Sequence, residues 1–106
     1  MIDEKIHSAT EEEVVLEEEK QVAEPPHYKV VLHNDDYTPM DFVVLILQKY
    51  FSLDETEAIR IMLLVHNTGI GIAGIFPREI AETKVHKVNA YARKNRYPLK
   101  CTMEKD

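Results

Sequence analysis

The chain has 106 residues, of which 44% are hydrophobic and 30% are charged, and this is the size and composition of one small domain. Its net charge of −6 is uneven: residues 1–26 hold nine acidic residues and two lysines, whereas residues 27–106 hold ten acidic and eleven basic residues. A body this close to neutral argues against a strong nucleic-acid-binding surface, which needs clustered Lys and Arg, and the single cysteine excludes an internal disulfide framework or a multi-cysteine zinc site.

The start of the chain is acidic where a signal peptide would be basic, and the longest apolar run, residues 42–47, is far too short to span a bilayer. We therefore expect a protein of the reducing cytoplasm that does not contact membranes. Residues 1–26 are predicted to form a disordered acidic arm, because low hydrophobicity with high net charge cannot offset the chain entropy lost on folding. Within the arm, the apolar letters VVL at residues 14–16 lie between two glutamate runs. The arm is either a solubilising tail or a segment that a partner engages.

The folded domain is predicted to span residues 27–106, after the prolines at 25 and 26. HYKVVLH at residues 27–33 predicts a strand. TPMD at residues 38–41 predicts a helix that runs to about Phe51, with Thr38 as its N-cap and Pro39 at its first position. This helix is apolar on nearly all sides, so it either is buried or presents a second face to a ligand or partner.

A second helix is predicted after Ser52 or Asp54 as its cap, and Gly69 gives it a left-handed stop. IGIAGIF at residues 70–76 predicts a strand whose glycines allow a close backbone approach. A third helix is predicted over residues 77–95, and the alternating letters LKCTMEK predict a half-buried strand over residues 99–105. The order β-α-α-β-α-β predicts a compact α+β domain, with three helices packed on a three-stranded antiparallel sheet.

Few residues suggest catalysis. Cys101 lies on the apolar side of the last predicted strand, as expected of a buried and inert thiol, and the three glycines fit no phosphate-binding spacing. A metal-dependent hydrolase remains an alternative, since His33, Asp35, Asp36 and His66 would converge if the first strand ended beside the second helix. Local turn and capping chemistry explains the two aspartates equally well, and we expect no metal and no cofactor.

The same region can also be interpreted as a binding site for a ligand. Asn34, Asp35 and Asp36 precede a helix N-terminus, where carboxylates stay ionised and suit a cationic group such as an ammonium, to which a ring nitrogen of His66 would add an acceptor. Beside them, two apolar pairs lie one turn apart on the first two helices. These pairs are Met40 with Val43 and Met62 with Val65. Periodicity alone favours plain core packing for them, whereas the excess apolarity of the first helix favours a pocket. A third interpretation is a generic interaction domain that uses this apolar helix face as a dimer surface.

Four segments together resemble the ClpS adaptor family over about residues 25–105. They are YKVVLHNDDYTPMDFVV, MLLVH, AETKV and YPLKCTMEK, in matching order and spacing. The resemblance implies a non-enzymatic bacterial N-recognin, which binds proteins that begin with Leu, Phe, Tyr or Trp. Such an adaptor delivers them to the N-terminal domain of the AAA+ unfoldase ClpA, which feeds the ClpP peptidase, and we expect it to be a monomer. The N-terminal extension in this family is engaged by the unfoldase during hand-over.

The resemblance also implies roles for individual residues. Asn34, Asp35 and His66 would bind the substrate's α-amino group, with Thr38 at the pocket mouth and Asp36 supporting the geometry of the loop. The pocket for the first side chain would be lined by Met40, Val43, Met62, Val65 and Leu99. Met40 would restrict the entry of β-branched residues. Glu79 and Lys84, on the early turns of the third helix, would face the unfoldase.

Overall fold

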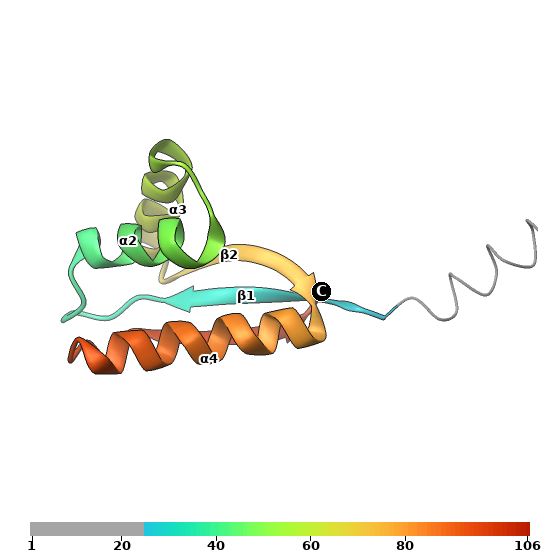
Figure 1. The fold of residues 1–106 in the computed structure, drawn as a ribbon. Coiled ribbons are helices and arrows are strands. Elements are labelled where there is room, and N and C mark those ends of the chain that lie inside the picture. Colours follow the sequence, from blue (N-terminus) through green and yellow to red (C-terminus); the bar gives the residue numbers. More distant parts are fainter. Residues whose placement is uncertain (1–24) are drawn as a thin grey trace, which may run out of the picture.

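The computed structural model describes residues 25–106, and the predicted arm up to residue 24 lies outside the described residues. The elements follow the order β1 (His27–His33), α2 (Met40–Phe51), α3 (Glu55–Thr68), β2 (Ile70–Pro77), α4 (Arg78–Lys94) and β3 (Lys100–Lys105). The strands form one antiparallel sheet in the order β2-β1-β3. Figure 1 shows α4 lying along β1, while α2 and α3 pack against each other beside β2. The predicted fold class is confirmed.

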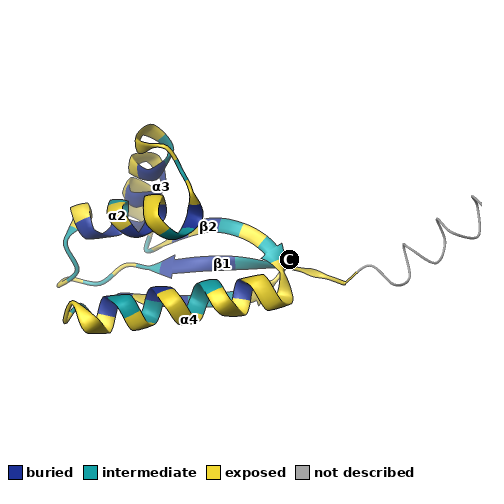
Figure 2. Ribbon diagram, viewed as in Figure 1, coloured by how far each residue is buried: buried dark blue, intermediate teal, exposed yellow. Residues whose placement is uncertain are grey.

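The sheet buries one face beneath the helices, and the other face is exposed along the edge strand β2 although Val31 of the central strand is buried. Val30 and Leu32 of the central strand are fully buried in the main core, together with Leu99 and Cys101. On the opposite face of the edge strand β2, three isoleucines (Ile70, Ile72 and Ile75) remain about half exposed. Figure 2 shows the buried positions of the helices turned toward the sheet and the exposed positions of α4 turned away from it.

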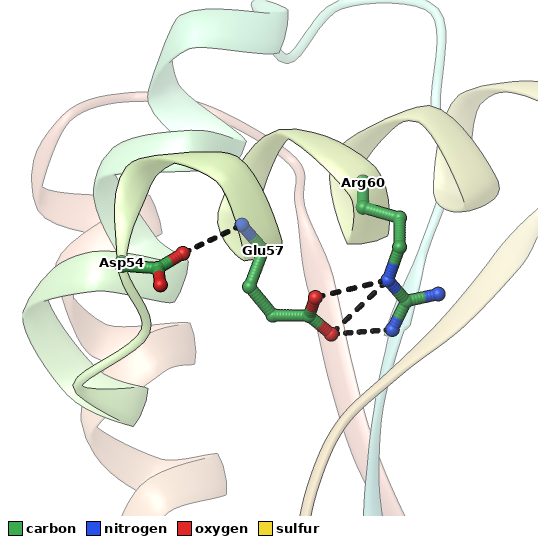
Figure 3. Close-up of polar contacts among 3 residues, drawn as sticks. All are labelled: Asp54, Glu57 and Arg60. Atoms are coloured by element: carbon green, nitrogen blue, oxygen red, sulfur yellow. Dashed lines mark hydrogen bonds and ion pairs between the residues drawn. The ribbon is translucent and has the colours of Figure 1, made fainter.

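Of the two caps predicted for α3, Ser52 and Asp54, the structure uses Asp54. Asp54 has extended backbone and its carboxylate accepts a hydrogen bond of 2.8 Å from the Glu57 backbone N–H, which satisfies one unpaired donor of the first turn. The Glu57 carboxylate in turn pairs with the Arg60 guanidinium one turn further along (Figure 3). Gly69 ends the helix with a φ of +95°, in the left-handed region that glycine adopts without strain.

The start of α2 differs from the prediction. Thr38 does not cap the helix: Pro39 occupies the N-cap position, and no side-chain hydrogen bond caps this end. The Thr38 hydroxyl donates instead to the Asp35 carboxylate, at 2.7 Å. The physical reason is that the charged Asp35 carboxylate is a stronger hydrogen-bond acceptor than a neutral group. It therefore accepts hydrogen bonds from the loop's donors, including the Thr38 hydroxyl, before the helix begins.

The close backbone approach predicted for the glycine-containing strand is present between β2 and α3. A Cβ added at Gly71 would lie 2.7 Å from Val65 Cγ2 and 3.3 Å from the carbonyl oxygen of Ile61. The pairing of β1 with β2 shifts its register between Val30 and Val31, so that Ala73 is an extra residue in β2. Glycine at 71 therefore lets α3 lie directly on the strand, which sets the position of Val65.

Side chains of α4 form hydrogen bonds with the backbone of β3, the other edge strand of the sheet. The Asn89 side chain donates to the Cys101 carbonyl and accepts from the Cys101 N–H, both at 2.9 Å, so it pairs with the free edge of β3. The Arg93 guanidinium donates to the carbonyl oxygens of Tyr97 and Leu99, at 2.7 and 2.8 Å. Burial raises the pKa of the Cys101 thiol to about 12, which fits the inert role predicted for it.

Candidate functional site

The loop between β1 and α2 is held by the Asp35 side chain. Asp35 Oδ1 accepts hydrogen bonds from the backbone N–H groups of Tyr37 and Thr38, both at 2.8 Å, and Oδ2 accepts from the Thr38 hydroxyl. At the start of the same loop, the Asn34 N–H donates to the Gly69 carbonyl at 2.8 Å. This bond ties the loop to the end of α3, so residues from two distant segments meet at one rim.

Asp35 is held in its charged form. Burial by itself would raise the pKa of this carboxyl. The hydrogen bonds from Thr38 and Tyr37, with the positive charge of Arg93, outweigh that effect and lower the pKa below its ordinary value. A half-buried carboxylate that is negative at neutral pH therefore faces the space between α2 and α3.

That space is a cavity of about 300 Å³. Its polar side comes from the 34–39 loop and the last turn of α3, and its apolar side from the first turn of α2 and the second half of α3. The lining residues are Asn34, Asp35, Asp36, Thr38, Pro39, Met40, Val43, Met62, Val65 and His66. The cavity thus combines an acidic, hydrogen-bonding rim with an apolar interior.

The apolar side is graded in depth. Val43, Met62 and Val65 are buried, with 9% or less of their surface exposed, and belong to the main core cluster. Met40 is 43% exposed, so it stands at the entrance and is the lining methionine with room to move. Core packing and pocket lining, the two interpretations of these residues, are therefore not exclusive, because the same side chains that pack the core also form the cavity wall.

Nine of the ten residues predicted for the amine site, the mouth and the side-chain pocket line this one cavity. The exception is Leu99, which is 1% exposed in the main core and is not among the lining residues. Pro39 lines the cavity but was predicted only as a helix-start residue. Its position directly before Met40 was the available signal.

The loop geometry that we expected Asp36 to support is held by Asp35 instead. Within residues 25–106 no hydrogen bond involves the Asp36 carboxylate, whereas the Asp35 carboxylate receives all three bonds that shape the loop. Asp36 is exposed at the cavity rim instead. An aspartate forms such a turn with donors two and three residues further on, and Asp35 is the one placed correctly for Tyr37 and Thr38.

The four residues of the metal alternative do not converge. His33 Nε2 forms a hydrogen bond of 2.7 Å with the Thr102 hydroxyl on β3, and His33 is absent from the cavity that holds Asp35 and His66. In the part of the chain that the structure describes, no three His, Cys, Asp or Glu residues lie close enough to hold a metal ion. Over the same residues, no helix is long and apolar enough to cross a membrane.

The two residues predicted to face an unfoldase lie on a different part of the surface. Glu79 and Lys84 line a groove of about 610 Å³ between the end of α2 and the first half of α4. The Lys84 ammonium donates to the Tyr50 carbonyl at 2.6 Å, so its position is fixed by α2. Among residues 25–106, none lines both this groove and the cavity at the 34–39 loop.

Fold and cavity together define a class of protein: a small α+β binding domain whose pocket suits a ligand that is cationic at one end and apolar at the other. Residues 23–102 match the family model of the ATP-dependent Clp protease adaptor protein ClpS. The chain belongs to this family, whose members are adaptors of the Clp protease and not enzymes.

Relatives of the same description match most of the chain. An ATP-dependent Clp protease adapter protein ClpS of Aromatoleum aromaticum is 50% identical over 97 residues, which cover 91% of this chain and 95% of that protein. The Ruegeria sp. (strain TM1040) protein is 56% identical over 77% of this chain and 73% of its own length. The Methylococcus capsulatus protein is 47% identical over 98% of both.

A solved structure agrees with the fold. Agrobacterium tumefaciens ClpS2 bound to L-phenylalaninamide superposes with a TM-score of 0.75 at 36% identity, covering 77% of this chain and 99% of that one. The resemblance found in the sequence is thereby confirmed.

Proposed function

We propose that this adaptor binds proteins through a free N-terminal Leu, Phe, Tyr or Trp and delivers them to a ClpA-type unfoldase. The observation that carries the proposal is the joint lining of one cavity by the Asp35 carboxylate and by Met40, Val43, Met62 and Val65. An N-terminal residue is the one part of a protein that offers an ammonium and an apolar side chain on the same carbon. The Agrobacterium ClpS2 structure, with its bound L-phenylalaninamide, supports this reading.

Asp35 retains the capacity to bind an ammonium. A carboxylate offers about four acceptor positions, and the loop uses three of them, two at Oδ1 and one at Oδ2. The remaining position on Oδ2 would accept one N–H of the α-ammonium. The exposed side chains of Asn34 and His66 line the same cavity and would accept the other two.

The apolar wall supplies the rest of the affinity. Burying a Leu or Phe side chain contributes about 1.5–3 kcal/mol, and each hydrogen bond to a charged group roughly the same. After the cost of association, the sum corresponds to a complex of about micromolar affinity. Neither half suffices alone, so the proposal requires both the free amine and the bulky side chain.

Delivery to the unfoldase is the second half of the proposal. The groove beside α4 would contact the unfoldase's N-terminal domain through Glu79 and Lys84, away from the substrate cavity. We further propose that the adaptor acts as a cytoplasmic monomer, with residues 27–106 as the binding domain and the acidic residues 1–26 as a separate arm.

Fluorescence anisotropy with peptides that differ only at the first residue tests substrate recognition. We expect about micromolar binding for Leu and Phe starts, with weaker binding for Ile. Acetylation of the Leu peptide should abolish binding, because it removes the cation and leaves Asp35 without its partner. Equal, weak binding across the panel would overturn the proposal.

A further inference from the structure

The side of the domain formed by α2 and α4 carries a row of lysines set among aromatic rings. Two neighbouring grooves, of about 610 and 460 Å³, share Tyr50 and Lys87 in their linings and so form one continuous surface. We call it the lysine groove. Its lysines are Lys49, Lys84, Lys87 and Lys94, and its apolar floor is formed by Tyr50, Ile80, Ala90 and Tyr91.

Two of the four lysines of this groove are positioned by aromatic rings or a backbone carbonyl. Lys49 Nζ lies 4.3 Å from the centroid of the Tyr91 ring and 5.7 Å from that of Tyr50. Lys84 Nζ lies 5.6 Å from the Phe76 ring and donates to the Tyr50 carbonyl. Within residues 25–106, no ion pair joins any of the four groove lysines to a carboxylate. The surface therefore combines four lysines with an apolar floor, and Glu79 is the one carboxylate among the described residues that line it.

One segment of this chain has the complementary pattern. Residues 11–19 read EEEVVLEEE, with three apolar residues between two groups of three glutamates. The six glutamate carboxylates can pair with the lysines, and the Val-Val-Leu side chains can pack on the tyrosines and isoleucine of the floor. No other segment of the chain has this arrangement of charge.

The attachment point also fits. The described chain begins at Pro25, and His27 pairs with Pro77, the residue directly before α4. Figure 1 shows the start of β1 and the start of α4 at the same end of the domain. The six residue-to-residue steps from Glu19 to Pro25 span up to about 20 Å when extended, and the 17 residues of α4 rise about 25 Å, so residues 11–19 can lie along the groove.

We propose that residues 11–19 of the acidic arm bind the lysine groove of their own chain. Tethering makes such binding effective even when each ion pair is weak, because a short linker holds the segment at an effective concentration of about millimolar. A consequence that rests on the proposed function is competition, since Glu79 and Lys84 line the groove and the bound arm would cover the surface assigned to the unfoldase.

Paramagnetic relaxation enhancement on the full-length chain tests the contact. A nitroxide placed on Thr10→Cys leaves residues 11–19 unchanged, and the native Cys101 is buried with a raised thiol pKa, so labelling is selective for position 10. At low salt we expect broadening of backbone amides at residues 49–52 and 83–94. The broadening should fade in about 1 M salt, where the Debye length is about 3 Å. It should persist on dilution, as an intramolecular contact must.

Charge variants of the spin-labelled chain show whether the arm binds the lysine groove or another lysine-bearing surface. Lys87→Glu with Lys94→Glu should abolish the broadening, as should replacing the six glutamates by glutamine. The matched pair Lys100→Glu with Lys105→Glu, two exposed lysines on β3, should leave it intact. The proposal is overturned if the groove amides are not broadened, if the β3 pair removes the effect instead, or if a mixture of ¹⁵N-labelled and spin-labelled chains broadens them equally. Peptide binding at the 34–39 cavity is measured separately, so failure here is distinct from failure of the proposed function.

Discussion

In the proposed function, Asp35 performs two tasks with one carboxylate. It shapes the loop by accepting from Tyr37 and Thr38, and in the proposed function its remaining acceptor position binds the substrate's amine. In the sequence, Asn34, Asp35 and Asp36 are neighbours, and each is a residue type that suits this loop chemistry. Only the observed bond pattern separates Asp35, which is held inward, from Asp36, which is exposed at the rim.

Asp35→Asn separates the two tasks. The amide keeps an oxygen that can accept from the Tyr37 and Thr38 N–H groups but loses the negative charge that the ammonium needs. We expect affinity for a Leu-start peptide to fall by about 1.5–3 kcal/mol, roughly tenfold to a hundredfold, with a near-normal thermal midpoint. Thr38→Val, which removes only the hydroxyl donor, is the control and should weaken binding less. Unchanged binding by the asparagine variant would remove Asp35 from the amine site.

Peptide binding should depend on pH through two groups. The pKa of Asp35 is lowered in the folded protein, so its stabilising effect on the loop is complete above its unfolded pKa of about 3.9 and is lost as the pH falls through the lower folded value. A peptide α-amino group has a pKa of about 7.7–8, so the cation disappears as the pH rises past that point. Anisotropy titrations should therefore show binding near pH 7 that declines as the pH rises above about 8, whereas the acetylated peptide should not bind at any pH.

We expect Met40 to control which first side chains enter the cavity. It is 43% exposed at the entrance, whereas the other apolar lining residues are buried. Met40→Ala should admit β-branched first residues by removing the side chain that narrows the opening, so Ile and Val peptides should gain affinity relative to Leu. Leu64→Ala, at an exposed position of α3 outside the cavity, serves as the control. An unaltered ranking of peptides would show that Met40 is not the gate.

At the scale of elements, the sequence predicted the strands and helices well because their signals are local. The β-branched run at 27–33, the Asp54 cap and the Gly69 stop each act within a few residues of themselves. The start of α2 was predicted one residue early, because Thr38 has a typical capping pattern but is captured by Asp35. Leu99 shows the matching limit for the site: alternation predicted correctly that it is buried, but the pattern does not tell whether it also reaches the cavity wall, so its place in the pocket stays a prediction.

Gly71 links the packing of α3 on β2 to the shape of the cavity. A Cβ at this position would approach Val65 Cγ2 to 2.7 Å, and Val65 is a wall residue. Gly71→Ala should therefore destabilise the fold by about 1–3 kcal/mol, as overpacking does, and weaken peptide binding as well. Gly74→Ala is a matched control, because its Cβ would meet the Phe76 ring at 2.6 Å, and Phe76 does not line the cavity. Chemical denaturation and anisotropy on both variants separate the loss of stability from the loss of the pocket.

At the scale of the whole molecule, α2 joins two surfaces with different proposed partners. Its first turn gives Met40 and Val43 to the substrate cavity, and its last turn gives Lys49 and Tyr50 to the lysine groove. Ten residues of helix separate Met40 from Tyr50, a rise of about 15 Å. Substrate and unfoldase can therefore occupy one small domain together, which an adaptor that hands over its substrate requires.

Independent loss of the two activities is the test of this arrangement. Glu79→Arg reverses an exposed charge on the first turn of α4 that takes part in no hydrogen bond through its carboxylate within residues 25–106. It is preferable to a Lys84 variant, because the Lys84 ammonium also donates to the Tyr50 carbonyl and its loss would disturb α2. Glu79→Arg should abolish association with the N-terminal domain of a ClpA-type unfoldase and leave the affinity for a Phe-start peptide unchanged. Asp35→Asn should leave the association with the unfoldase domain unchanged and weaken peptide binding roughly tenfold to a hundredfold. Calorimetric titrations of both variants against both partners check this, and a variant that loses both partners together would contradict two separate surfaces.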